Sequence, residues 1–235
     1  MTKRLVLMVG LLMSLLMAST SLVAAQAAPN VTKIGKAVEA TDIPALIDGL
    51  AAPIAIRDLP ADFTDATTVD ITSSKDVNAA TCVYDASTLT LEGAAAYELE
   101  VDPEAGPFIR ACASINYLVY TKKALGLDPL GDFKSGLLGS LDTEPGTPDA
   151  NGGVATLEDM TVAGADAVLF TYTIENGSRA ASVQILTVIV GNVIVLTQIQ
   201  TQGDTVIDAE TLAPVSTSLM EAAVTHLGEV ADEAA

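Results

Sequence analysis

The stretch from Asp166 to Gln202 constrains the fold most, because it predicts three consecutive β-strands joined by two tight turns. Asn176-Gly177 separates the first two alternating runs, and this dipeptide is the strongest short hairpin signal. Gly191-Asn192 separates the next two, and a leading glycine is typical of a type II′ turn. Because a two-residue turn fixes which residues pair across a hairpin, we expect an antiparallel meander of defined register.

The expected register divides the meander into two faces. With the turns at these two dipeptides, Val168 falls opposite Ile185, and Ile189 falls opposite Ile194. One face is then expected to be a core face: Val168, Phe170, Tyr172, Ile174, Val183, Ile185, Ile189, Ile194 and Leu196. The second face is apolar near the second turn and polar towards the first, which indicates that other parts of the chain cover it at one end only. The candidate docking face is therefore placed on it: Leu186, Val188, Val190, Thr171 and Gln184.

The rest of the chain predicts further strands and helices. Alternating apolar residues indicate strands near residues 67–72, 96–101, 108–121 and 154–162. A short helix is expected over Ile43–Leu50, and a longer one after Asp128-Pro129. A final helix is expected over Thr211–Leu227, with Gly228 just beyond its end. We therefore expect an α+β fold, in which helices, including a C-terminal one, pack on an antiparallel β-sheet meander.

The first 27 residues predict a secretory signal peptide. Lys3-Arg4 precede an apolar run, and small residues follow it, so cleavage is expected after Ala25 or Ala27. An uncleaved membrane anchor is the alternative. Residues 28–58 are then a linker and short N-terminal helix, and residues 59–235 a single α+β domain. We expect a secreted or extracytoplasmic protein of the cell envelope, with no membrane span after signal cleavage.

The charge of the chain restricts its partners. It has 30 acidic and 11 basic residues, for a formal net charge of −19. Nucleic acid and anionic lipid both bind positive surfaces, so neither is an expected partner. The expected partner is an unknown protein or small ligand at the envelope.

The two cysteines, Cys82 and Cys112, both lie in the part of the chain expected to be exported. An even count in an oxidising compartment predicts one disulfide. Two buried free thiols are the alternative.

No residue is assigned to catalysis, a cofactor or a metal. The single histidine, His226, has two interpretations: a general base, or a helix-end residue favoured by the helix dipole. The sequence has no G-x-S-x-G, Ser-x-x-Lys or C-x-x-C motif. The acidic loop from Asp142 to Gly153 does not match the calcium-loop spacing, because Gly153 stands at the twelfth position where Glu is needed. A solvated loop is expected, and an irregular calcium site is the alternative.

The order of elements has a family resemblance. Leu59-Pro60-Ala61-Asp62-Phe63 leads into the first strand, and the helix after Asp128-Pro129, the meander and the closing helix follow. From Leu59 to the end, this layout resembles the PsbP-like fold of secreted bacterial domains and lipoproteins. The resemblance implies a non-enzymatic assembly, binding or sensor role, and it transfers no functional residue because no family motif matches position by position.

The sequence therefore predicts an exported, non-catalytic binding or structural domain acting at or outside the cell surface. Two alternatives stay open. One is a hydrolase that uses two Asp or Glu side chains, which needs no histidine. The other is an assembly subunit of an envelope complex.

Overall fold

The computed structural model describes residues 29–52, 54–73, 82–102, 111–139, 141, 143–177, 179–203 and 206–235. Within them, seven strands form one sheet in the order β1-β2-β3-β7-β6-β5-β4, and every neighbouring pair is antiparallel. The strands are β1 (Phe63–Val69), β2 (Gly93–Val101), β3 (Ala111–Val119), β4 (Val154–Val162), β5 (Ala165–Asn176), β6 (Arg179–Val190) and β7 (Val193–Gly203). The expected signal peptide, residues 1–27, lies outside the described residues.

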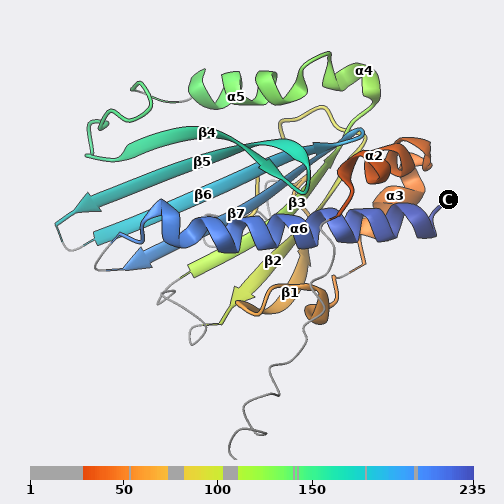
Figure 1. Ribbon diagram of the computed structural model, residues 1–235, viewed down its shortest axis with the longest axis horizontal. Coiled ribbons are helices and arrows are strands. Elements are labelled where there is room, and N and C mark those ends of the chain that lie inside the picture. The colour runs from red at the N-terminus through yellow and green to blue at the C-terminus, as the bar shows by residue number, and fades with distance from the viewer. Residues whose placement is uncertain are drawn as a thin grey trace, which may run out of the picture.

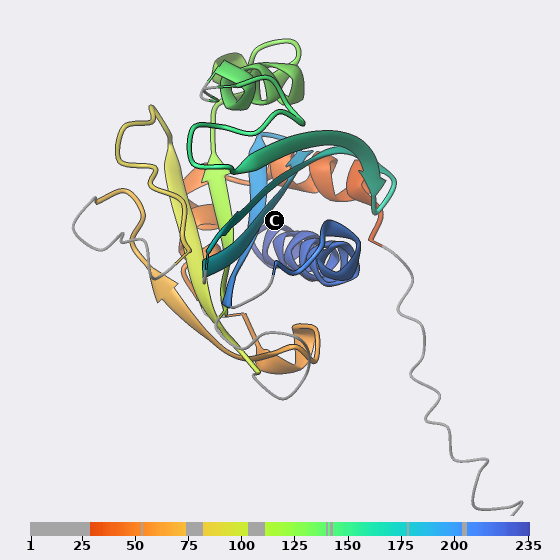
Figure 2. The same ribbon diagram turned by 90° about the vertical axis from the view of Figure 1, so that its left-hand side faces the viewer.

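Helices cover both faces of the sheet, which confirms the expected α+β class. The helices are α2 (Val31–Ala40), α3 (Ile43–Leu50), the 3-10 turn η1 (Ile56–Asp58), α4 (Lys122–Leu125), α5 (Pro129–Gly139) and α6 (Ala209–Glu233). The sheet curls around α6, while α2 and α3 lie beside the C-terminal end of that helix (Figures 1 and 2). α5 runs along the opposite side, next to β5 and β6. Among the described residues, no helix has the length and apolar character needed to cross a membrane.

The main core lies between α6 and the sheet. Asp208 caps the helix, because its Oδ1 accepts a hydrogen bond from the Thr211 amide at 2.7 Å. Apolar side chains then recur every three or four residues and are fully buried, including Leu212, Leu219 and Leu227. They pack on the sheet face formed by Leu186, Val188, Val190, Val193 and Val195. The C-terminal helix is therefore the element that closes the core.

This packing corrects the candidate docking face. Its five residues lie on the sheet face that α6 covers and are at most 5% exposed: Leu186, Val188, Val190, Thr171 and Gln184. The polar end of the face has partners in the helix, because Ser216 Oγ lies 2.7 Å from Gln184 Oε1, and Gln184 Nε2 donates to the Ala209 carbonyl. A polar residue in a strand is thus buried here because a helix satisfies it, and alternation alone does not reveal that partner.

The opposite face of the sheet carries a second, smaller core. Residues 82–91 and the helices α4 and α5 cover Ala96, Leu118, Ile194 and Leu196. The expected disulfide between Cys82 and Cys112 is present, and it attaches this covering segment to β3. Two hydrogen bonds assist it: Ser114 Oγ donates to the Cys82 carbonyl, and the Tyr84 amide donates to Asn116 Oδ1.

The first hairpin differs from the expected register by two residues. Asn176 pairs with Arg179, so residues 177 and 178 form the loop, and Phe170 pairs with Ile185. Gly177 provides the positive φ of +65° at the first loop position. An even shift leaves each side chain on its expected face. The second hairpin, with Ile189 opposite Ile194, has the expected register.

The N-terminal segment also differs from expectation. The part expected to be a linker forms α2, and both α2 and α3 contribute buried side chains to the main core, among them Val38, Leu46 and Leu50. α6 continues to Glu233 and does not stop before Gly228. A Cβ at Gly228 would lie 3.0 Å from Ile34 Cγ1, so this glycine permits close packing of α2 on α6.

Candidate functional site

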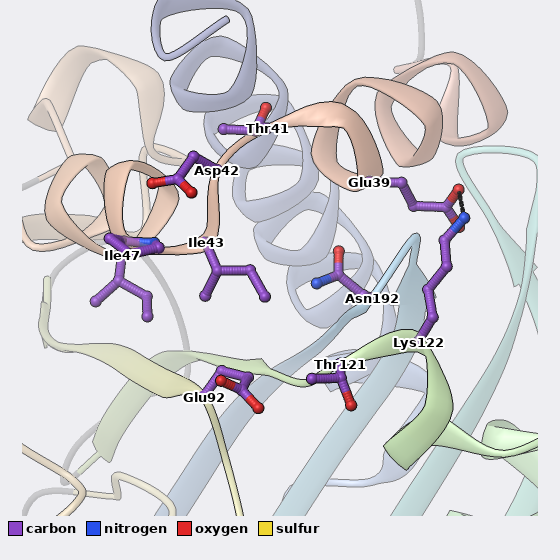
Figure 3. A pocket seen from close by; sticks show the side chains of 10 residues that line it. Glu39, Thr41, Asp42, Ile43, Ile47, Glu92, Thr121, Lys122 and Asn192 are labelled. Carbon is purple, nitrogen blue, oxygen red and sulfur yellow. Dashed lines mark ion pairs between the residues drawn. The ribbon is translucent and has the colours of Figure 1, made fainter.

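A hollow of about 560 Å³ lies where α2 and α3 meet the end of the sheet (Figure 3). Its size falls within the range of small-molecule sites in proteins. The lining residues come from four separate parts of the chain: Glu39, Thr41, Asp42, Ile43, Pro44, Ile47, Glu92, Thr121, Lys122 and Asn192. The hollow is thus assembled by the tertiary fold and not by a local sequence motif.

Thr41 holds the upper wall in place. It is buried, and its hydroxyl lies 2.9 Å from the Ala37 carbonyl in α2 and 3.3 Å from the Ala231 carbonyl in α6. Asp42 follows as the N-cap residue of α3, but its carboxylate makes no capping hydrogen bond. The short α2–α3 link is therefore fixed to α6, while the Asp42 carboxylate stays free of the helix.

The β6–β7 turn forms the inner wall, and it fits against α2 through two glycines. Gly191 has a φ of +61°, as the expected type II′ turn requires at its first position. A Cβ at Gly191 would lie 2.6 Å from the Gly35 carbonyl oxygen, and a Cβ at Gly35 would lie 3.0 Å from the Gly191 amide nitrogen. Only glycine at both positions allows α2 to approach the turn so closely.

Asn192, the next residue in the turn, is 5% exposed. The side-chain nitrogen Nδ2 donates a hydrogen bond to the Tyr120 carbonyl at 2.7 Å, and the backbone carbonyl of Asn192 accepts one from the Tyr120 amide at 3.0 Å. The bond from Nδ2 sets the orientation of the amide, and Oδ1 is left without a hydrogen-bond partner among the described residues. In Figure 3 the oxygen is the upper atom of this amide, on the side of Thr41, and the nitrogen is the atom nearer Ile43. A buried acceptor without a partner costs about 1–3 kcal/mol, so a ligand donor that reached it would recover that energy.

The hollow is acidic. Three carboxylates line it against one ammonium group, and that ammonium, on Lys122, forms an ion pair with Glu39 at one side. Asp42 and Glu92 lie on the other side, above and below the opening (Figure 3). Within the part of the chain that the structure describes, neither of these two carboxylates has a basic partner.

The acidic loop before β4 is organised by its own hydrogen bonds. Asp149 Oδ1 accepts from the Asn151 and Gly153 amides at 2.7 and 2.9 Å, and Oδ2 accepts from the Tyr172 hydroxyl at 2.9 Å. The amide bond from Gly153, followed by that from Asn151, lowers the pKa of Asp149. In the described segments, no group of three or more His, Cys, Asp or Glu side chains is placed to hold a metal ion.

His226 does not lie at a helix end but in the interior of α6, against two buried tyrosines. Its Nε2 is 3.3 Å from the Tyr97 hydroxyl, and its ring centroid is 6.3 Å from that of Tyr117. The same Tyr97 hydroxyl contacts the carbonyls of Leu50 and Ala52, so it joins the end of α3 to the sheet. Burial raises the pKa of both tyrosines, which keeps them protonated hydrogen-bond donors.

We expect His226 to make the fold less stable in mild acid. Burial lowers the pKa of His226, although the nearby charges of Asp58 and Glu233 partly oppose this shift. The unfolded chain therefore binds the proton more readily, and stability that is present above an unfolded pKa of about 6.5 is lost as pH falls. Urea unfolding at pH 7 and pH 5 should show a larger loss for wild type than for His226→Gln. Equal losses in both proteins would contradict this role.

The chain has only distant likenesses to known proteins. No protein-family profile and no curated protein sequence matches it. One similar solved structure is a Pseudomonas aeruginosa protein of unknown function, PA94, at 17% identity and a TM-score of 0.34, with 59% of this chain and 84% of that one covered. Another is a mutant of the protein Mog1, at 14% identity and a TM-score of 0.27, with 73% and 93% covered. Both likenesses are too weak to support an argument about function.

The site described here was not expected from the sequence. The sequence pattern identifies Asn192 only as a turn residue, and Asp42 only as the residue before the expected helix Ile43–Leu50. Neither position contains a motif for binding, because the residues that meet here are far apart in sequence. The one sequence feature that points to this site is the Gly191-Asn192 pair, because its tight turn buries the Asn192 amide beside α2.

Proposed function

We propose that this protein is an extracytoplasmic, non-catalytic binding domain whose small ligand occupies the hollow between the α2–α3 link and the β6–β7 turn. The carrying observation is Asn192, a residue of the lining whose side-chain oxygen is buried and has no hydrogen-bond partner among the described residues. Folded proteins rarely leave such an acceptor without a donor. A ligand that donates a hydrogen bond there supplies the missing partner.

The rigidity of the walls supports a binding role. Hydrogen bonds fix Thr41 to α6 and Asn192 to Tyr120, the residue just after β3, and α2 packs closely against the turn at the two glycines. A hollow whose backbone is already held in place needs only side-chain adjustment when a ligand binds, which favours affinity. Export is supported by the N-terminal sequence pattern and by the disulfide between Cys82 and Cys112.

A fragment screen tests the site. We expect a library of neutral, cationic and anionic fragments, followed by amide NMR spectra, to yield binders that shift the signals of Thr41, Thr121 and Asn192. Glu92→Trp should abolish these shifts, because Glu92 is exposed at the opening and an indole fills the space. Glu175→Trp is the matched control, since Glu175 is exposed at the far end of β5. The proposal fails if no fragment shifts the three signals, or if the shifts persist in Glu92→Trp.

A further inference from the structure

We infer that the hollow selects a primary ammonium ion carried on a short apolar stem. This inference rests on the proposed function, and it adds the chemical class of the ligand. Three features of the lining carry it: the charge balance, the excess of hydrogen-bond acceptors and the apolar floor.

The charge balance favours a cation. Glu39, Asp42 and Glu92 line the hollow against the single ammonium of Lys122, which is already paired with Glu39. A ligand carboxylate or phosphate would therefore meet uncompensated negative charge, whereas an ammonium ion would be attracted to it. The pair between Lys122 and Glu39 shows that an ammonium group fits at one side of this hollow.

The polar groups of the lining are mainly acceptors. Asn192 presents an unpartnered oxygen, because its nitrogen is already bonded to the Tyr120 carbonyl. Asp42 presents a carboxylate that does not cap α3. An ammonium group offers three donors and no acceptor, so it matches this set. Oδ1 of Asn192 is closed to solvent, and contact with it requires a small displacement of the neighbouring side chains.

The apolar side chains that line the hollow favour a ligand whose ammonium group is carried on an apolar stem. Ile43, Pro44 and Ile47 come from the first turns of α3, and Ile47 lies directly over Gly93 at the start of β2. A Cβ at Gly93 would lie 2.1 Å from Ile47 Cδ1, so the glycine leaves room for this side chain. A stem of a few methylene groups would bury its surface on these residues while the ammonium ion faces Asp42 and Glu92.

The test compares probes of one chain length: hexylammonium, hexan-1-ol and hexanoate, titrated into the full chain and followed by amide NMR. We expect hexylammonium to shift the signals of Thr41, Thr121 and Asn192 and to bind at least tenfold more tightly than the other two. Its affinity should fall as salt is raised, because part of the attraction is electrostatic. Nα-acetyl-lysine methylamide, as a fourth probe, shows whether the ammonium of a lysine side chain is accepted as well as that of a free amine.

The double variant Asp42→Asn with Glu92→Gln should weaken hexylammonium binding at least tenfold and leave hexan-1-ol binding unchanged. Asparagine remains a good N-cap residue, so α3 should keep its start. The control, Glu100→Gln with Glu175→Gln, removes the same charge from exposed positions at the other end of the sheet and should bind like wild type. The inference is overturned, while the binding site stands, if hexan-1-ol, hexanoate or calcium chloride binds the hollow as tightly as hexylammonium. If no probe and no fragment binds there, the proposed function itself fails.

Discussion

Gly191→Val is expected to cost about 2–5 kcal/mol of the free energy of unfolding. The residue has a φ of +61°, a conformation that costs an L-residue roughly 1–2 kcal/mol. The new Cβ would also lie 2.6 Å from the Gly35 carbonyl oxygen, and overpacking of this kind costs roughly 1–3 kcal/mol more. Because the obstacle is backbone, α2 must move away from the turn. Urea unfolding measures the loss, and it is a large fraction of the stability of a typical domain.

A second glycine separates the cost of the backbone conformation from the cost of the close contact with α2. Gly177 has a similar φ of +65°, but a Cβ there would meet nothing within 4 Å. Gly177→Val should therefore lose only the roughly 1–2 kcal/mol due to backbone strain. Equal losses in the two variants would show that the contact between α2 and the turn contributes nothing. Gly191→Val should also abolish fragment binding, since it moves the wall that carries Glu39.

Replacing both cysteines by serine is expected to cost about 3.5 kcal/mol, because the disulfide closes a long loop in the unfolded chain. The two residues are 30 positions apart. The sheet should still form, since the main core lies on its other face. The segment from Cys82 to Leu91 should become more open to hydrogen exchange, although its bonds to Ser114 and Asn116 remain.

Wild-type protein with reductant is the control for the double variant, and both should unfold at the same urea concentration. Protein collected from the culture medium should be lighter than its reduced form by two hydrogens and should begin at Gln26 or Ala28. A double variant as stable as oxidised wild type would contradict the stabilising role. A full-length chain retained in the cytoplasm would contradict export.

The position of the ligand site depends on parts of the chain that only folding brings together. Asp42, Glu92, Lys122 and Asn192 have no common motif, and no periodic pattern relates them. Their meeting follows from the strand order, in which β7 lies next to β3 and places its turn beside the end of that strand. Strand order between distant segments is set by packing and not by local sequence preference.

The sequence by itself determined the local features of the fold. Turn residues and alternation specified the second hairpin to the residue and the first to within two, because a glycine with positive φ restricts where a chain can reverse. Two cysteines were enough to predict their pairing. What only the tertiary structure decided is which face of the meander lies deepest. Alternation assigns residues to two faces but does not say which face receives a helix, and the Gln184 side chain is buried because α6 provides its hydrogen-bond partners.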